Sequence, residues 1–154
     1  MREGAEESRV REMLKNAFAD VPCPHKWQEA SACGPLTHEE CLGFRRTFYN
    51  YEADEVHYML PFLLQDLMNT RTGSDVETED AEHLIMQLDP MNEDLVIQEI
   101  KLAQFAHFTH HQSLSICEWL KLAKTWEDLT IFKEEVDSAT RYWCGRAALQ
   151  TVGL

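Results

Sequence analysis

The chain has 154 residues, enough for one folded domain, and 44% of them are hydrophobic. Its 27 acidic residues outnumber the 14 Lys and Arg residues, giving a formal charge of −13. This excess disfavours direct binding to nucleic acid or anionic lipid, because the main attractive force would be missing. No apolar run approaches the roughly 20 residues needed to cross a membrane, and the first residues lack the apolar core of a secretory signal. We therefore expect a cytoplasmic location.

The cysteines favour the same compartment. They are odd in number and have no C-x-x-C spacing, and they stand at Cys23, Cys33, Cys41, Cys117 and Cys144. A chain of this length needs no covalent cross-links to fold. The sequence predicts reduced thiols.

The first third of the chain predicts two helices joined by an irregular segment. Apolar residues recur at three- and four-residue steps across 6–20, which indicates a helix that ends at the Val-Pro-Cys-Pro of 21–24. The irregular segment runs to Pro35, and its Trp27 is expected to pack on the core. Thr37 and Glu40 have the spacing of a capping box, so a second helix should begin there. Its expected buried residues are Cys41, Phe44 and Phe48.

The middle of the chain predicts three more helices. Residues 54–68 are strongly apolar but contain Pro61, and we expect a break just before it. A helix over 78–88 should bury Leu84, Ile85 and Leu88, and Asp89-Pro90 should end it. The next helix should begin at an Asn92 cap and run to about Phe108. Its apolar residues extend well beyond one face, which predicts a central, largely buried element.

Two further helices complete the expected fold. Thr109 and Gln112 form a second capping-box pattern, before a helix that should bury Leu114, Ile116, Cys117, Leu120 and Ala123. The last helix is expected over 128–146, with Ile131, Phe132, Val136, Ala139 and Tyr142 or Trp143 inside. No segment alternates like a strand. The sequence predicts one all-α, compact domain of six to seven helices over residues 1–154.

The acidic residues are unevenly distributed. Between Thr47 and Ile100 there are 13 acids and one base, Arg71, so this third of the chain carries −12 of the net −13. Clustered like charges repel one another. One interpretation is a solvated surface; the other is a docking face for a basic protein, with Tyr49, Tyr51 or Met91 as apolar anchors. The candidate partner-binding residues are Tyr51, Glu52, Asp54, Glu55, Asp75, Glu77, Glu79, Asp80 and Glu82.

Catalytic and metal-binding patterns are weak. The histidines at 107, 110 and 111 span a predicted helix junction, where capping and surface roles are expected. The Asp-x-x-His pairs Asp54/His57 and Asp80/His83 only partly match the Glu-x-x-His pattern of helical di-iron sites. The cysteines lack the local signature of a Cys–His enzyme, and no phosphate-binding glycine loop is present. We expect no metal, no cofactor and no enzymatic activity.

Three short motifs carry a resemblance. They are Ala-Phe-Ala-Asp-Val-Pro at 17–22 followed by Pro24, Tyr-Met-Leu-Pro-Phe-Leu-Leu at 58–64, and Phe-Thr-His-His-Gln at 108–112. Their order resembles a family of small uncharacterised bacterial all-helical domains, in which a glycine usually follows the proline where this chain has His25. The family supplies no catalytic residue. In size, acidity and helical character the chain is also similar to bacterial immunity proteins, which bind and neutralise a toxic effector, often a nuclease.

These observations together favour a cytoplasmic protein-binding function. We expect an immunity protein that occludes the active or substrate-binding site of a basic effector such as a nuclease. One alternative is a secretion chaperone or helical adaptor, which would expose an apolar groove for an extended peptide. The other is an enzyme with an unrecognised site, which would need a deep pocket with converging His and carboxylate groups.

Overall fold

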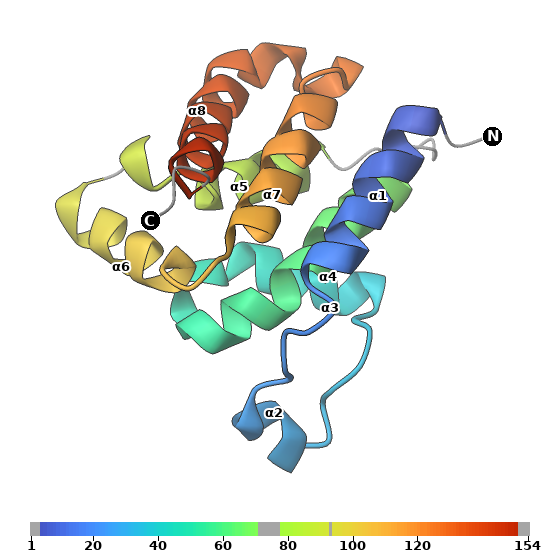
Figure 1. Cartoon of the computed structure of the whole chain (residues 1–154), viewed down its shortest axis with the longest axis vertical. Helices are drawn as coiled ribbons and strands as arrows, with labels where there is room; N and C mark the ends of the chain where they lie inside the picture. Colours follow the sequence, from blue (N-terminus) through green and yellow to red (C-terminus); the bar gives the residue numbers. More distant parts are fainter. Residues whose placement is uncertain (1–3, 71–77, 93, 151–154) are drawn as a thin grey trace.

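The computed structural model describes residues 4–70, 78–92 and 94–150, and no strand occurs among them (Figure 1). The described residues form one all-α, compact domain with eight α-helices, slightly more than predicted. Three 3₁₀ helices are η1 (Phe48–Asn50), η2 (Pro90–Asn92) and η3 (Glu127–Phe132). The α-helices are α1 (Ala5–Ala17), α2 (His25–Glu29), α3 (His38–Arg46), α4 (Ala53–Thr70), α5 (Thr78–Gln87), α6 (Leu95–Phe105), α7 (His110–Ala123) and α8 (Lys133–Gln150).

Helix α7 lies between α1 and α8 and in contact with both (Figure 1). Its Trp119 is fully buried, and the indole Nε1 donates a 3.0 Å hydrogen bond to the carbonyl oxygen of Leu64 in α4. Gln112, in the first turn of α7, lies 2.6 Å from His57 Nε2 of α4 and donates to the carbonyl of Ala17. Helix α7, rather than α6, is therefore the central element of the core.

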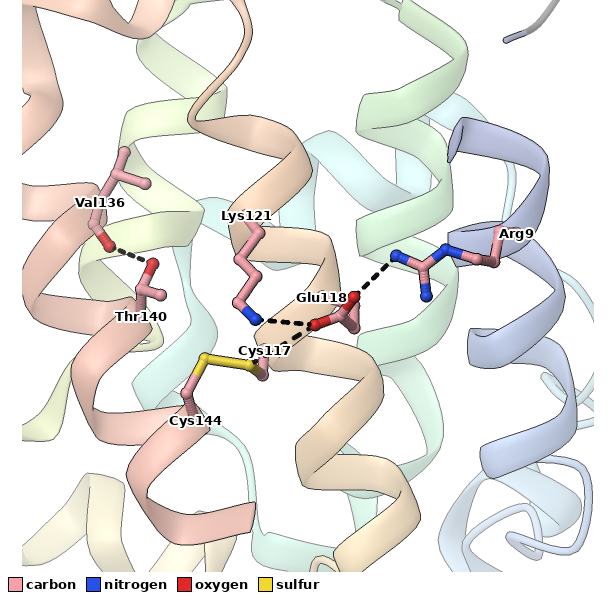
Figure 2. The surroundings of a disulfide bond; sticks show 7 residues. All are labelled: Arg9, Cys117, Glu118, Lys121, Val136, Thr140 and Cys144. Carbon is pink, nitrogen blue, oxygen red and sulfur yellow. Dashed lines mark hydrogen bonds and ion pairs between the residues drawn. A yellow bond between two sulfur atoms is a disulfide. The ribbon is translucent and has the colours of Figure 1, made fainter. Parts of the chain in front are cut away.

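Two adjacent residues of α7 connect this helix to α8 and to α1 (Figure 2). Cys117 forms a disulfide with Cys144 of α8. The next residue, Glu118, pairs with Arg9 of α1 at 2.7 Å and with Lys121 at 3.1 Å. Burial alone would raise the pKa of Glu118, but the hydrogen bonds from Arg9 and Lys121 bring that pKa below its ordinary value. The charged form of Glu118 therefore helps to hold α1 against α7.

The two predicted capping boxes are confirmed. Thr37 Oγ1 accepts a hydrogen bond from the amide of Glu40, whose carboxylate accepts one from the amide of Thr37. Thr109 and Gln112 make the same reciprocal pair at the start of α7. Helices α3 and α7 accordingly begin at the predicted residues, since these exchanges satisfy amides that have no partner within the helix.

Most of the residues expected inside these helices are buried. They include Val10, Leu14, Phe18, Cys41, Phe48, Leu84, Ile85, Leu88, Ile116, Leu120, Ala123, Val136, Ala139 and Trp143. The three-to-four-residue spacing of apolar side chains therefore identified the inner face of most helices correctly.

The predicted break before Pro61 is wrong, because α4 continues through it to Thr70. Proline cannot donate to the carbonyl four residues earlier, and inside a helix it costs about 3 kcal/mol. Pro61 is itself buried, as are Leu60, Leu63 and Leu64 around it. Burying each such leucine stabilises the fold by roughly 1.5–3 kcal/mol, so packing on both sides offsets the cost of the proline.

Helix α6 differs most from its prediction. It begins after Asp94, whose side chain accepts a hydrogen bond from the amide of Ile97 at 3.1 Å. The predicted cap, Asn92, belongs to η2 instead. The expectation of a central, buried helix is also wrong. Helix α6 lies at an edge of the domain (Figure 1), and Leu95 and Val96 are 75% and 69% exposed. Only one side of α6 packs against the rest of the chain.

The last helix begins later than predicted. Residues 127–132 form η3, and α8 starts at Lys133. Ile131, expected inside, is 80% exposed, whereas Val136, Ala139 and Trp143 are buried as expected. The tighter turn of η3 changes the phase of the apolar positions, so Ile131 does not lie on the buried stripe of α8.

The predicted reduced thiols are corrected by two disulfides. Cys23 pairs with Cys33 across α2, and Cys117 pairs with Cys144 between α7 and α8. The paired Cα atoms lie 6.0 and 4.9 Å apart, within the usual range for a disulfide. Counting and spacing cysteines could not show this, because folding brings the partners together. Among the described residues, no helix has the length and apolar character needed to cross a membrane.

Cys41 is the one free cysteine, and it is buried. Burial raises the pKa of its thiol to about 12, with a further contribution from the Asp66 carboxylate, so Cys41 should be unreactive in the folded protein. We expect no titratable thiol in the native oxidised chain, one after unfolding without reductant, and five after unfolding with reductant. A thiol-specific dye measures all three. Three or more thiols in the unreduced, unfolded chain would contradict the disulfide pairing, and a Cys41→Ser variant should show none there.

Candidate protein-docking site

Four of the predicted partner-binding residues lie together at the start of α4. Glu52 and Asp54 are exposed, Tyr51 is half-buried and Glu55 is only 3% exposed. Glu55 reaches back one turn, and its Oε1 accepts the amide of Glu52 at 3.0 Å. Acidic residues are favourable here because the first turn of a helix leaves amides without partners and has a positive end.

The Glu55 carboxylate is used inside the protein. Its Oε2 accepts the indole Nε1 of Trp27 at 2.8 Å, and Lys26 Nζ lies 3.4 Å from its Oε1. Burial would raise the pKa of Glu55, but the hydrogen bonds from the Glu52 amide and Trp27, with the Lys26 charge, bring that pKa below its ordinary value. Glu55 thus fastens α2 to α4. Its carboxylate is paired inside the protein, and Glu52 and Asp54 are the exposed carboxylates of this group.

An aromatic cleft opens beside this carboxylate, with a volume of about 390 Å³. Trp27 and Phe44 stack with ring centroids 5.4 Å apart, and Tyr51 meets the edge of Phe44 at 5.2 Å. The expectation that Trp27 packs on the core is confirmed by its 7% exposure, but Trp27 also lines the cleft. The sequence did not indicate Trp27 and Phe44 as site residues, because α2, α3 and α4 bring them together only on folding.

The border of the cleft is rich in carboxylates. Glu40 and Glu55 line it, together with Lys26. Carboxylate oxygens of Glu52, Asp54 and Glu55 all lie within 4.8 Å of one another, so Glu52 and Asp54 extend this acidic border onto the surface. Aromatic ring faces attract cations, and a carboxylate can accept paired hydrogen bonds from a guanidinium. This arrangement suits a lysine or arginine side chain.

Within the part of the chain that the structure describes, the same three carboxylates form the group whose spacing could hold a metal ion. Both oxygens of Glu55 already accept hydrogen bonds, and one oxygen of Asp54 accepts the Glu55 amide. A calcium ion takes six to eight oxygen ligands. These side chains supply part of such a shell, and the Glu55 oxygens are engaged within the protein, so we assign the group to the acidic border of the cleft.

The remaining predicted residues do not join this group. Glu79, Asp80 and Glu82 belong to α5 (Figure 1), which packs against α3 and α8. The side chain of Glu82 is half-buried. Asp75 and Glu77 lie outside the described residues. The candidate acids therefore come from two elements, the start of α4 and α5, and Glu82 is the one acid of α5 whose side chain lies among the described residues.

Other acids of this region serve the fold. Asp66 pairs with the buried Arg45 at 3.0 Å and with His38 at 2.9 Å. Asp89 is 3% exposed, and its carboxylate accepts the amide of Met91. The concentration of charge in the sequence therefore overstates how much of it faces solvent.

Two of the histidines considered as metal ligands have structural contacts. His57 lies 2.6 Å from Gln112 Oε1 and stacks on Phe108 with ring centroids 4.6 Å apart. His110 Nδ1 lies 2.9 Å from the carbonyl oxygen of Ala147, so it joins the start of α7 to α8. Both rings therefore contribute to packing between helices.

Comparisons with known proteins found no matching family model, curated protein or solved structure. The resemblances to small bacterial helical domains and to immunity proteins therefore remain predictions.

A Glu55→Gln substitution should lower the free energy of unfolding by about 1–3 kcal/mol at pH 7, because the charge beside Lys26 is lost and one indole or amide donor loses its acceptor. The folded-state pKa of Glu55 is lowered, so its contribution is present above the ordinary pKa of a carboxyl group and is lost as pH falls through the folded-state value. The difference between wild type and variant should therefore shrink on acidification. Urea unfolding across this range measures it. A pH-independent difference would contradict the role of the charge, and the exposed Glu52→Gln serves as control.

Proposed function

We propose that this chain is a protein-binding protein of the immunity type, which neutralises a basic toxic effector such as a nuclease by occluding its active or substrate-binding site. The observation that carries the proposal is the aromatic cleft with its acidic border at the start of α4. The net charge of −13 supports it, since an anionic protein attracts a cationic partner over several ångströms before contact.

The cleft and its border would act in two stages. Exposed Glu52 and Asp54 would speed the encounter by electrostatic steering. A lysine or arginine of the partner would then pack against Tyr51 and the neighbouring rings, where aromatic faces and carboxylates both favour it. A central aromatic anchor supplies binding energy that exposed charges alone lack.

A nuclease is the class of partner that best suits this chemistry. It must present Lys and Arg side chains to hold the phosphates of its substrate. A protein carrying carboxylates and an aromatic cleft can occupy the same groups and exclude the substrate. Inhibition of this kind is stoichiometric and requires no catalysis by the chain.

The cytoplasmic location expected from the sequence is opposed by the two disulfides. Structural disulfides persist in oxidising compartments and are rare in the cytosol. Alkylating free thiols in the source cells before purification, and counting the alkylated cysteines, decides between the cytoplasm and an oxidising compartment. Five reduced cysteines would support the cytoplasm, and one would support an oxidising compartment.

The double substitution Glu52→Gln with Asp54→Asn should slow association with the partner by about tenfold at low salt, because two steering charges are removed beside the anchor. The partner is first captured with the full wild-type chain from its source cells, and association is then measured by stopped-flow at several salt concentrations. Glu12→Gln with Glu134→Gln is the matched control, since it removes two exposed charges on α1 and α8.

A second variant neutralises Asp75, Glu77, Glu79, Asp80 and Glu82 together. Its association rate shows whether the acids of α5 and the preceding residues contribute to binding independently of those beside the cleft. If the cleft variant binds at the wild-type rate with an unchanged salt dependence, the cleft is not the docking site. If the captured partner is not basic, the proposed mode of inhibition is wrong.

A further inference from the structure

Helix α6 presents an apolar surface to solvent. Leu95 and Val96 are the most exposed, and Ile100 and Leu102 are 38% and 39% exposed. The exposed residues of α6 are Leu95, Val96, Glu99, Ile100, Leu102 and Ala103, and Glu99 is the one charged member of this set. The sequence pattern predicted a helix buried on most sides, yet the chain by itself covers only one.

The apolar surface continues onto η2 and α8. Both α6 and α8 pack against η2, whose Met91 is 59% exposed. Met91 lines a groove of about 540 Å³ with Tyr142, Gly145 and Leu149 of α8, and Leu149 is 63% exposed. We call the exposed residues of α6 together with this groove the α6 face. Apolar patches of this extent on a soluble domain mark interaction surfaces.

We propose that the α6 face binds the same face of a second copy of this chain. A two-fold interface joins a surface to itself, so the surface must complement its own charges. Asp94 and Glu99 place exposed carboxylates at the N-cap of α6 and on α6, and Arg141 of α8 is an exposed residue that lines the groove. A two-fold partner can therefore set the arginine of one copy against the carboxylates of the other.

Charge also argues against other occupants. Arg141 and Arg146 both line the groove, so a cationic partner is disfavoured here and is attracted instead to the acidic border of the cleft. Two copies that each carry −13 repel each other least where their surfaces are least charged. The α6 face, with Glu99 as the single charge among the exposed residues of α6, offers such a surface. This inference does not depend on the proposed function.

Sedimentation equilibrium of the full chain measures the association directly. The chain mass is 17.9 kDa, and we expect the average mass to rise towards twice this value as the concentration is raised to about 200 µM. Raising the salt from about 50 to 500 mM should strengthen the dimer, because screening weakens the repulsion between two copies of charge −13 more than it weakens the few arginine–carboxylate pairs of the interface. Binding to a basic partner should weaken over the same range, so the two surfaces are distinguishable.

Val96→Glu should raise the dissociation constant of the dimer at least tenfold, because it places a further carboxylate in the apolar part of the α6 face. Ile131→Glu is the matched control, since Ile131 is 80% exposed on η3, far from α6 (Figure 1). Both side chains are exposed, so circular dichroism and melting temperature should stay near wild type.

A monomer mass at every concentration and salt tested would overturn the proposal. Equal dimerisation by Val96→Glu and wild type would also overturn it, as would equal weakening by the control. Tighter binding of an extended apolar peptide to the α6 face than of a second copy would favour the adaptor alternative instead.

Discussion

The structure depends on one constraint: a polar group that is buried between helices must find a partner there. Helix α7 meets this constraint with the Trp119 indole bonded to Leu64 and Gln112 bonded to Ala17, and its partly exposed Glu118 pairs with Arg9. These contacts reach only α1 and α4, and the Cys117–Cys144 disulfide adds α8. Helix α7 is in this way joined to α1, α4 and α8.

The same constraint builds the candidate docking site. Once the Glu55 carboxylate is buried, it requires donors, and Trp27 supplies one from a segment that has little core of its own. The hydrogen bond brings the indole against Phe44, and the stacked pair becomes one wall of the cleft. Glu55, which the sequence predicted on the acidic surface, therefore positions the aromatic wall of the cleft. Glu52 and Asp54 remain exposed and available to a cation.

Charge in the sequence and charge on the surface are different quantities in this protein. The region from Thr47 to Ile100 carries nearly all of the net charge, but Glu55 and Asp89 are buried and Asp66 is paired with Arg45. The acids that remain exposed in the described parts lie in separate places. Helix α6, from the same region of sequence, exposes an apolar surface. The acidic border of the cleft suits a cationic partner, whereas the α6 face suits an apolar one.

The sequence by itself determined the helical class, both capping boxes and most buried faces, because these depend on residues within a few positions of one another. Tertiary structure decided the rest. Packing on both sides keeps α4 continuous through Pro61, and the placement of α6 at an edge exposes residues that its pattern predicted to be buried. The disulfide pairs and the aromatic wall of the cleft join residues from different elements. Local spacing carries no information about such contacts, since they exist only after the helices have packed.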